Sequence, residues 1–303
     1  MEDNKKTDSS VIFSCRGLGG SNEEAKITNK ALGEAKQAIE TAVDSGITLF
    51  DHAGIYNRGK AETVFGMVLK DTPSLQNMLR IQTKVGICPI SGPAGFNTYN
   101  WSRSYLLQSV ENSLRRLGVE HLERVLLQGA DVLFEPEEVA DAFRIMKERG
   151  WVEEFGVCNI SVNRIRFLNS YVDQPLRVNQ LSLSLGNTRI IEEGLLENCR
   201  LSNIKVQTVG SLDGGLFTSG LREGLTEAQQ KTSAAVEEIA IAKESSREAV
   251  VLAWLMRIAG SVQPVISTTD PSRIRASSQA ERVELSREEW YRLWILTRGG
   301  HLP

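Results

Sequence analysis

The chain alternates short apolar segments with longer amphipathic ones. The short segments are rich in β-branched residues, and each leads into a polar residue and a loop, which is typical of strands. Eight such segments occur, at residues 11–13, 47–50, 79–83, 124–127, 155–158, 178–183, 204–209 and 262–266. Because their apolar runs are nearly continuous, the pattern predicts strands buried on both faces, as in a parallel sheet.

The segments between the strands have the apolar spacing of helices that pack on one face. Apolar residues recur at intervals of three and four within residues 35–43, 106–117 and 139–146, followed by Gly46, Gly118 and Gly150. Glycine just beyond a helix adopts the left-handed backbone that ends it. Two more helical segments, 271–280 and 286–296, follow the last strand.

Eight strand–helix repeats in 303 residues predict an α/β fold, a (β/α)8 TIM barrel with extra C-terminal helices. We expect the last helix to pack across the barrel. The alternative is an open doubly wound sheet, which would carry a GxGxxG turn after its first strand. Gly17-Leu18-Gly19-Gly20 has the wrong spacing for that turn. No linker divides the chain, so residues 1–303 are predicted to form a single domain.

Composition excludes several classes of protein. Hydrophobic residues make up 41% and charged residues 24%, with a net charge of −3, so there is no basic field for nucleic acid. No apolar run reaches the ~18 residues of a membrane helix, and the N-terminal MEDNKKTDSS lacks the apolar core of a signal peptide. We expect a cytoplasmic protein without nucleic-acid or membrane partners, and the oligomeric state stays open.

Cysteine and histidine give little material for metal or disulfide chemistry. The four cysteines lie far apart without a CxxC pair, which predicts free thiols. The three histidines show no HxxxH or HxH spacing, so no metal site is expected. His52 follows Asp51 directly and is expected to point away from it, because successive side chains of a strand alternate.

Polar residues end most of the predicted strands. In a (β/α)8 barrel the catalytic groups lie at the C-terminal ends of the strands. These ends carry Asp51, Lys84, Gln128, Cys158 with Asn159, Gln180, Ser211, and Ser267 to Thr269. A single polar strand end is ordinary because it leaves the core. Their combination in one barrel indicates a site.

Taken in order, these residues resemble the aldo-keto reductase superfamily. Its members carry D-x-A-x-x-Y after strand 2, a lysine ending strand 3, L-L-H ending strand 4, G-V-S-N ending strand 5 and N-Q ending strand 6. This chain has Asp51 and Tyr56, Lys84, Leu126-Leu127-Gln128, Gly156 to Asn159, and Asn179-Gln180. Phe50-Asp51-His52-Ala53 is most similar to the bacterial oxidoreductase branch. The resemblance implies hydride transfer between NADP(H), or else NAD(H), and a small carbonyl compound or alcohol.

The resemblance implies catalytic roles for Asp51, Tyr56, Lys84 and Gln128. A carbonyl that accepts hydride needs a proton donor, which the Tyr56 phenol would supply. A neighbouring ammonium is expected to lower the pKa of that phenol, and Asp51 would keep Lys84 charged. The alternative is a buried ion pair beside a core tyrosine.

Gln128 stands where the family usually has histidine. A glutamine amide donates a hydrogen bond but does not titrate. An oxidoreductase is the first interpretation. The alternative is a barrel that binds the cofactor with little turnover and acts as a sensor or subunit, and a metal- or phosphate-dependent lyase is a distant third.

The resemblance also implies a set of cofactor-binding residues: Cys158, Asn159 and Gln180 at the nicotinamide, Ser211 and Leu212 at the pyrophosphate, and Ser267, Thr268, Thr269, Arg273 and Arg275 at the adenosine phosphate. Asp213 would repel phosphate unless it points away. Asp270 would disfavour the 2′-phosphate of NADP unless it turns back to cap the following helix. The two arginines favour NADP(H), which we expect.

The connection from residue 85 to residue 101 is longer than a barrel loop requires. It carries Phe96, Tyr99 and Trp101, which makes it a candidate wall of the substrate pocket; the alternative is a surface loop. Ile55 and Trp101 are the expected substrate contacts.

Overall fold

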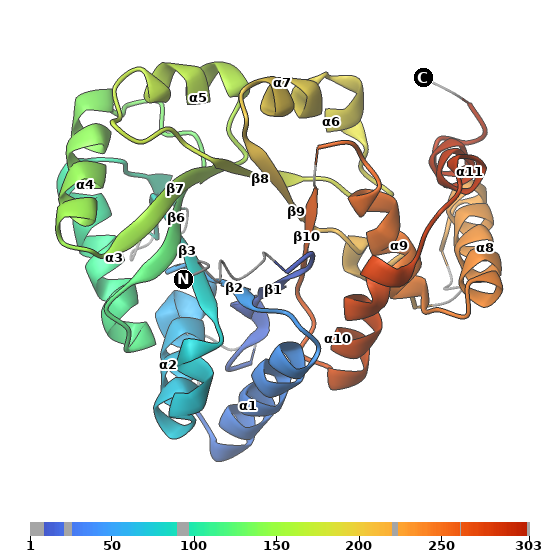
Figure 1. Ribbon diagram of the computed structural model, residues 1–303, viewed down its shortest axis with the longest axis horizontal. Helices are drawn as coiled ribbons and strands as arrows, with labels where there is room; N and C mark the ends of the chain where they lie inside the picture. The colour runs from blue at the N-terminus through green and yellow to red at the C-terminus, as the bar shows by residue number, and fades with distance from the viewer. Residues whose placement is uncertain (1–8, 21–25, 90–96, 220–223, 261, 302–303) are drawn as a thin grey trace, which may run out of the picture.

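Eight parallel strands close into a barrel in a computed structural model that describes residues 9–20, 26–89, 97–219, 224–260 and 262–301 (Figure 1). In chain order they are β1 (Ile12–Ser14), β2 (Leu49–Asp51), β3 (Arg80–Val85), β6 (Leu122–Gln128), β7 (Val152–Cys158), β8 (Val178–Ser182), β9 (Lys205–Val209) and β10 (Gln263–Ile266). Ile12 of β1 pairs with Val265 of β10, which closes the sheet. The predicted (β/α)8 barrel is confirmed.

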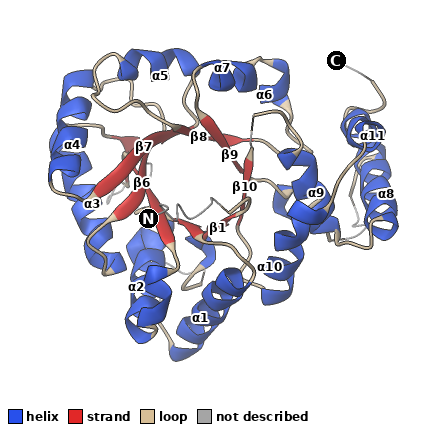
Figure 2. Cartoon of the chain, viewed as in Figure 1, coloured by secondary structure: helices blue, strands red, loops and turns tan. Residues whose placement is uncertain are grey.

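Helices surround the barrel (Figure 2). They are α1 (Asn29–Asp44), α2 (Lys60–Asp71), α3 (Arg103–Leu117), α4 (Pro136–Glu148), α5 (Val162–Asn169), α6 (Arg189–Glu192), α7 (Leu195–Leu201), α8 (Glu227–Ala242), α9 (Arg247–Met256), α10 (Pro271–Ser278) and α11 (Arg287–Thr297). Short 3-10 turns are η1 (Cys15–Gly17), η2 (Tyr56–Gly59), η3 (Pro73–Asn77), η4 (Asp213–Gly215) and η5 (Gln279–Arg282). The three helices predicted with a following glycine are α1, α3 and α4, and each of those glycines has a positive φ.

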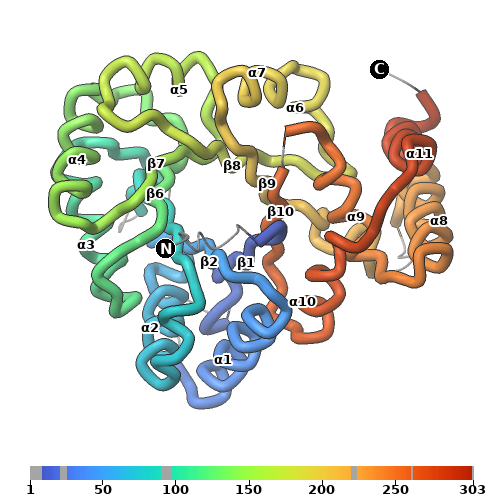
Figure 3. The backbone as a smooth tube through the Cα atoms, in the orientation of Figure 1, coloured from blue at the N-terminus to red at the C-terminus, as the bar shows by residue number. Residues whose placement is uncertain are grey.

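The last helix does not pack across the barrel, so that expectation is wrong. Helix α11 lies beside α8, outside the helices that contact the barrel (Figure 3). Trp290 of α11 stacks on Trp254 of α9 with ring centroids 4.9 Å apart. Each indole N–H donates to the other residue's backbone carbonyl, at 3.0 and 2.9 Å. This reciprocal pair fixes α11 against the outer surface of α9.

The barrel interior is only partly apolar. Ile12, Leu49 and Val265 form a small apolar cluster inside it, separate from the large core between strands and helices. Other buried interior positions carry Gln82, Arg124, Gln180 and Gln207. Barrel interiors are usually filled by branched apolar side chains, so these polar groups require partners.

Within the described residues, no helix is long and apolar enough to cross a membrane, and no cluster of three or more histidine, cysteine or acidic side chains could hold a metal. The four cysteines form no disulfide. His52 is fully buried and lies edge-on to Phe65, with ring centroids 4.6 Å apart, so it points into the core as predicted. Burial, and to a smaller extent the charge of Lys84, lowers the pKa of His52 to about 3.

Helix α2 approaches α3 so closely that only glycine fits at residue 66. A Cβ on Gly66 would lie 2.3 Å from the backbone oxygen of Arg116. Alanine is normally the better helix residue by roughly 1 kcal/mol, but here it must push two helices apart. We predict that Gly66→Ala lowers the free energy of unfolding by about 1–3 kcal/mol in urea denaturation.

Gly33 in α1 is the matched control, because a Cβ there meets nothing within 4 Å. Gly33→Ala should raise the free energy of unfolding by up to about 1 kcal/mol. Equal effects of the two substitutions would contradict the close α2–α3 contact.

Candidate active site

Tyr56 begins a strained turn at the C-terminal end of β2. Asn57 and Arg58 have φ values of 48° and 54°, and Gly59 has a φ of 84°. Side chains other than glycine adopt this region at a cost of about 1 kcal/mol or more each. Asn57 Nδ2 donates to the backbone oxygen of Gly20 at 2.8 Å. This bond ties the turn to the segment that follows β1.

Arg116 of α3 supports the other side of the turn. A Cβ on Gly59 would lie 2.8 Å from Arg116 Cδ, so the arginine packs directly against the backbone. Arg116 Nε donates to Glu62 Oε2 at 2.7 Å, and Glu62 Oε1 accepts from Thr83 Oγ1 at 2.8 Å. Because Thr83 precedes Lys84 on β3, this buried network links the Tyr56 turn to the strand that carries the lysine.

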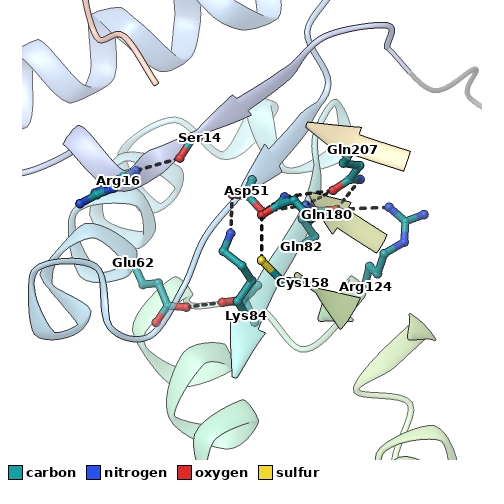
Figure 4. A network of polar contacts seen from close by, with 11 residues as sticks. Ser14, Arg16, Asp51, Glu62, Gln82, Lys84, Arg124, Cys158, Gln180 and Gln207 are labelled. Atoms are coloured by element: carbon teal, nitrogen blue, oxygen red, sulfur yellow. Dashed lines mark hydrogen bonds and ion pairs between the residues drawn. The ribbon is translucent and has the colours of Figure 1, made fainter. Parts of the chain in front are cut away.

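Asp51 and Lys84 form a buried ion pair (Figure 4). Lys84 Nζ is 2.5 Å from Asp51 Oδ2, and the two side chains are 1% and 0% exposed. Burial alone lowers the pKa of Lys84, but the charges of Asp51 and other neighbours and the hydrogen bond to Asp51 raise it above its ordinary value. Lys84 therefore carries its charge at neutral pH, with Nζ 5.1 Å from the centroid of the Tyr56 ring.

The net pKa of Tyr56 is raised, not lowered as the sequence led us to expect. Burial of the phenol is the largest influence and raises its pKa; Lys84 lowers it, and Asp51 raises it further. The lysine thus acts with the expected sign but is outweighed by the loss of water around the phenol. Tyr56 keeps its proton at neutral pH, as a proton donor must.

Tyr56 and Lys84 open onto a cavity of about 730 Å³. Its other lining residues include Ile55, Gln128, Cys158, Asn159, Gln180 and Ser267. The structure therefore brings together most of the strand-end residues singled out in the sequence. Asp51 is fully buried and contacts two of the lining residues, Lys84 and Gln180.

A second cavity of about 370 Å³ shares Ser267 with the first. It is lined by the glycine-rich turn at residues 210–215, including Ser211 and Leu212, and by Thr268, Thr269 and Arg273. Arg273 Nε lies 3.3 Å from Glu248 Oε1. Arg275 is exposed on α10 and is not among the lining residues.

Two carboxylates near the second cavity accept hydrogen bonds from nearby protein groups. Asp213 accepts hydrogen bonds from Ser184 Oγ and, at 3.0 Å, from the Gly186 backbone N–H, so it points away. Burial raises the pKa of Asp213. Asp270 caps α10, accepting from the Ser272 backbone N–H at 2.8 Å, and the hydrogen bonds from Ser272 lower the pKa of Asp270.

Gln180 has only part of its amide available to a ligand. Its Nε2 donates to Asp51 Oδ1 at 3.2 Å and to Gln207 Oε1 at 3.1 Å. Cys158 Sγ donates weakly to its Oε1 at 3.8 Å. Asn159 Oδ1 accepts from the Ser182 backbone N–H at 3.1 Å. The two amides therefore offer a ligand Gln180 Oε1 and Asn159 Nδ2 more readily than a bidentate amide pair.

Of the expected substrate contacts, Ile55 lines the main cavity and Trp101 does not. Ile55, Lys84 and Gln128 also line a side cavity of about 350 Å³. Trp101 is fully buried behind Gly86, where a Cβ would lie 2.5 Å from the indole nitrogen. Tyr99 lies in the short hairpin of β4 (Ile87–Cys88) and β5 (Thr98–Tyr99), and Phe96 lies outside the described residues.

Sequence reasoning missed the groups that support the site: Asn57, Glu62, Gln82, Arg116, Arg124 and Gln207. One signal was present, because Gln82 precedes Lys84 by two residues and period two places both side chains on one face of a strand. The supports on α2 and α3 have no comparable signal, since their contacts depend on how the helices pack.

The chain matches the sequence model of the Aldo/keto reductase family over residues 17–296. An uncharacterized oxidoreductase of Bacillus subtilis is 32% identical over 275 residues, which cover 89% of this chain and 90% of the relative. A 6-dehydroglucose reductase of Agrobacterium fabrum is 32% identical over 264 residues, 86% of each chain.

Solved structures share the fold. A glycerol dehydrogenase from Gluconobacter oxydans superposes with a TM-score of 0.85 at 21% identity, covering 96% of this chain and 92% of that one. An aldo/keto reductase from Klebsiella pneumoniae in complex with NADP and acetate has a TM-score of 0.76 at 22% identity, covering 95% and 91%.

Removing the lysine should leave Asp51 as an uncompensated buried charge. We predict that Lys84→Met lowers the free energy of unfolding by about 3–5 kcal/mol, measured in urea at neutral pH. The double substitution Asp51→Asn with Lys84→Met should recover part of this loss.

Lys231 provides the control, because it pairs with Glu227 at 2.6 Å on the exposed surface of α8. Lys231→Met should change stability by no more than about 1 kcal/mol. A similar small effect of Lys84→Met would contradict a buried charged pair.

Proposed function

Because the chain belongs to the aldo/keto reductase family and is an oxidoreductase, we propose that it transfers hydride between NADP(H) and a small carbonyl compound or alcohol. The observation that carries the proposal is the protonated Tyr56 phenol on the cavity wall, beside a lysine that a buried carboxylate keeps charged. A buried Asp–Lys pair with a core tyrosine would not require the phenol to line a cavity.

The donors of the two neighbouring cavities, which share Ser267, suit a dinucleotide. Gln180 and Asn159 present amide atoms to the main cavity. The second cavity presents the glycine-rich turn at 210–215, the hydroxyls of Thr268 and Thr269, and the side chain of Arg273. Backbone N–H groups, hydroxyls and a guanidinium suit phosphate oxygens. These residues would hold the cofactor, which supplies or accepts the hydride when bound.

Tyr56 acts as the general acid in carbonyl reduction. As negative charge develops on the substrate oxygen, the phenolic O–H bond breaks and the proton moves to that oxygen. The charge left on the phenolate is stabilised by the Lys84 ammonium. Asp51 holds that ammonium in place and charged. Alcohol oxidation reverses the same proton movement.

We assign Gln128 to the position where family members usually carry histidine, on the match of Leu126-Leu127-Gln128. Gln128 lines both the main and the side cavity, so its NH2 is placed to donate to a substrate oxygen. Its inability to titrate favours a second candidate, a cofactor-binding barrel with little turnover. Wild-type NADPH oxidation separates the two. Robust oxidation with any member of a carbonyl panel that includes 6-dehydroglucose would exclude the second candidate.

The preference for NADP(H) rests on Asp270 and Arg273. The Asp270 carboxylate caps α10, and Arg273 lines the second cavity. Asp270→Asn keeps the cap and removes the charge, so it should raise the NADPH-to-NADH affinity ratio by about two- to fivefold, the scale of one exposed charge pair. Direct titration of both cofactors is the measurement. Tighter binding of NADH than of NADPH by the wild type would contradict this assignment.

Tyr56→Phe tests the proton donor. We predict a loss of ~10²-fold or more in turnover, while saturating NADPH raises the melting temperature as much as in the wild type. Tyr171→Phe is the control, because Tyr171 is exposed and lies outside the cavities. Unchanged turnover in Tyr56→Phe would show that another group donates the proton.

A further inference from the structure

A row of polar side chains runs across neighbouring strands of the barrel beneath the proposed site (Figure 4). Asp51, Gln82, Arg124 and Glu154 are register partners on the neighbouring strands β2, β3, β6 and β7. The first three are at most 3% exposed, and the side chain of Glu154 is 41% exposed. The row therefore joins the buried carboxylate below Tyr56 to a carboxylate that reaches solvent.

Every hydrogen-bonding group of Gln82 is used. Its Nε2 donates to Asp51 Oδ1 at 2.7 Å and to Gln207 Oε1 at 2.8 Å. Its Oε1 accepts from Arg124 Nη1 at 3.2 Å and from Gln207 Nε2 at 3.0 Å. Arg124 is held in turn by Glu154, through Nη2 at 2.5 Å and Nε at 3.1 Å.

The direction of the Gln82 amide follows from its two charged neighbours. A guanidinium only donates and a carboxylate only accepts. Gln82 must therefore turn its oxygen to Arg124 and its NH2 to Asp51. Gln207 is held in the matching direction, because its Oε1 also accepts from Gln180 Nε2 at 3.1 Å. Arg124 is the charged donor to the Gln82 oxygen.

We propose that Gln82, held by Arg124, is a positioning residue that aims Asp51 at Lys84. Without this amide, the described residues leave Asp51 Oδ1 with the longer bond from Gln180, at 3.2 Å. A buried carboxylate that loses a donor takes up a proton more readily. The consequence for catalysis rests on the proposed function, whereas the effect on Asp51 does not.

Few other titratable groups near Asp51 change charge around neutral pH. The groups that face the pair are Lys84, Tyr56, Cys15, Cys158, His52, Glu62 and Arg124. Burial raises the pKa of Cys158 to about 11 and lowers that of His52 to about 3. Glu62 forms an ion pair with Arg116 at 2.6 Å. His52 changes charge in the acid range, so Asp51 is distinguished from its neighbours by its own carboxylic-acid band.

Infrared spectroscopy across an acid titration measures this protonation directly. The carboxylic-acid band of Asp51 is identified as the one missing from Asp51→Asn. In Gln82→Leu and in Arg124→Met, we expect this band at a pH about one to two units higher than in the wild type, the scale of one hydrogen bond to a charged group. Arg124→Lys keeps a donor-only cation and should restore the wild-type titration.

Gln263→Leu is the matched control. Gln263 is a buried glutamine on β10 whose Nε2 donates to the Ser9 backbone oxygen at 2.9 Å, and it has no bond to Asp51. In Gln263→Leu, the Asp51 band should appear at the same pH as in the wild type. The proposal is overturned if Gln82→Leu and Arg124→Met titrate like Gln263→Leu, or if both unfold before any Asp51 band appears.

A kinetic measurement keeps the two proposals distinguishable. If Asp51 supports catalysis, the acidic limb of kcat/KM should move by the same amount in Gln82→Leu and Arg124→Met, with NADPH affinity unchanged. A shifted infrared band with an unmoved acidic limb would support the positioning of Asp51 and contradict its catalytic use.

Discussion

The buried pair of Asp51 and Lys84 is the interaction on which the rest of the site depends. Two charges with at most 1% of either side chain exposed lose their hydration, and their attraction offsets that loss only when further hydrogen bonds complete it. An apolar pair of similar volume would be at least as stable. The barrel interior is polar where other barrels are apolar because Gln82 and Gln180 supply those hydrogen bonds.

The same pair explains the construction around Tyr56. The Lys84 ammonium can stabilise charge on the Tyr56 oxygen only if the phenol is held close to it. The strained turn is fixed by Asn57 on one side and by Arg116 on the other. Glu62 then connects Arg116 to Thr83, the neighbour of the lysine. Strain in the turn is thus balanced by contacts from the segment after β1 and from α3, which hold the phenol near the ammonium.

Sequence alone predicted the barrel and most of the cavity lining because both follow from local rules. Buried parallel strands leave continuous apolar runs, and strand ends in a closed barrel converge, so Lys84, Gln128 and Gln180 line one cavity. The structure differs from the sequence-based expectations where the outcome depends on side-chain packing or on loss of solvent. The partner of α11, the burial of Trp101 behind Gly86 and the exposure of Arg275 depend on side-chain packing between distant segments. The direction of the Tyr56 pKa depends on how much water the fold removes.

The pH dependence of carbonyl reduction tests the central claim, that a buried, protonated Tyr56 beside a charged Lys84 donates the proton. Because the pKa of Tyr56 is raised, its proton is present throughout the neutral range and is lost only above the ordinary phenol value of about 10. The account predicts a rate with saturating NADPH that stays level from neutral pH to about pH 10 and falls beyond it. A rate that falls through pH 7 to 8 would contradict it.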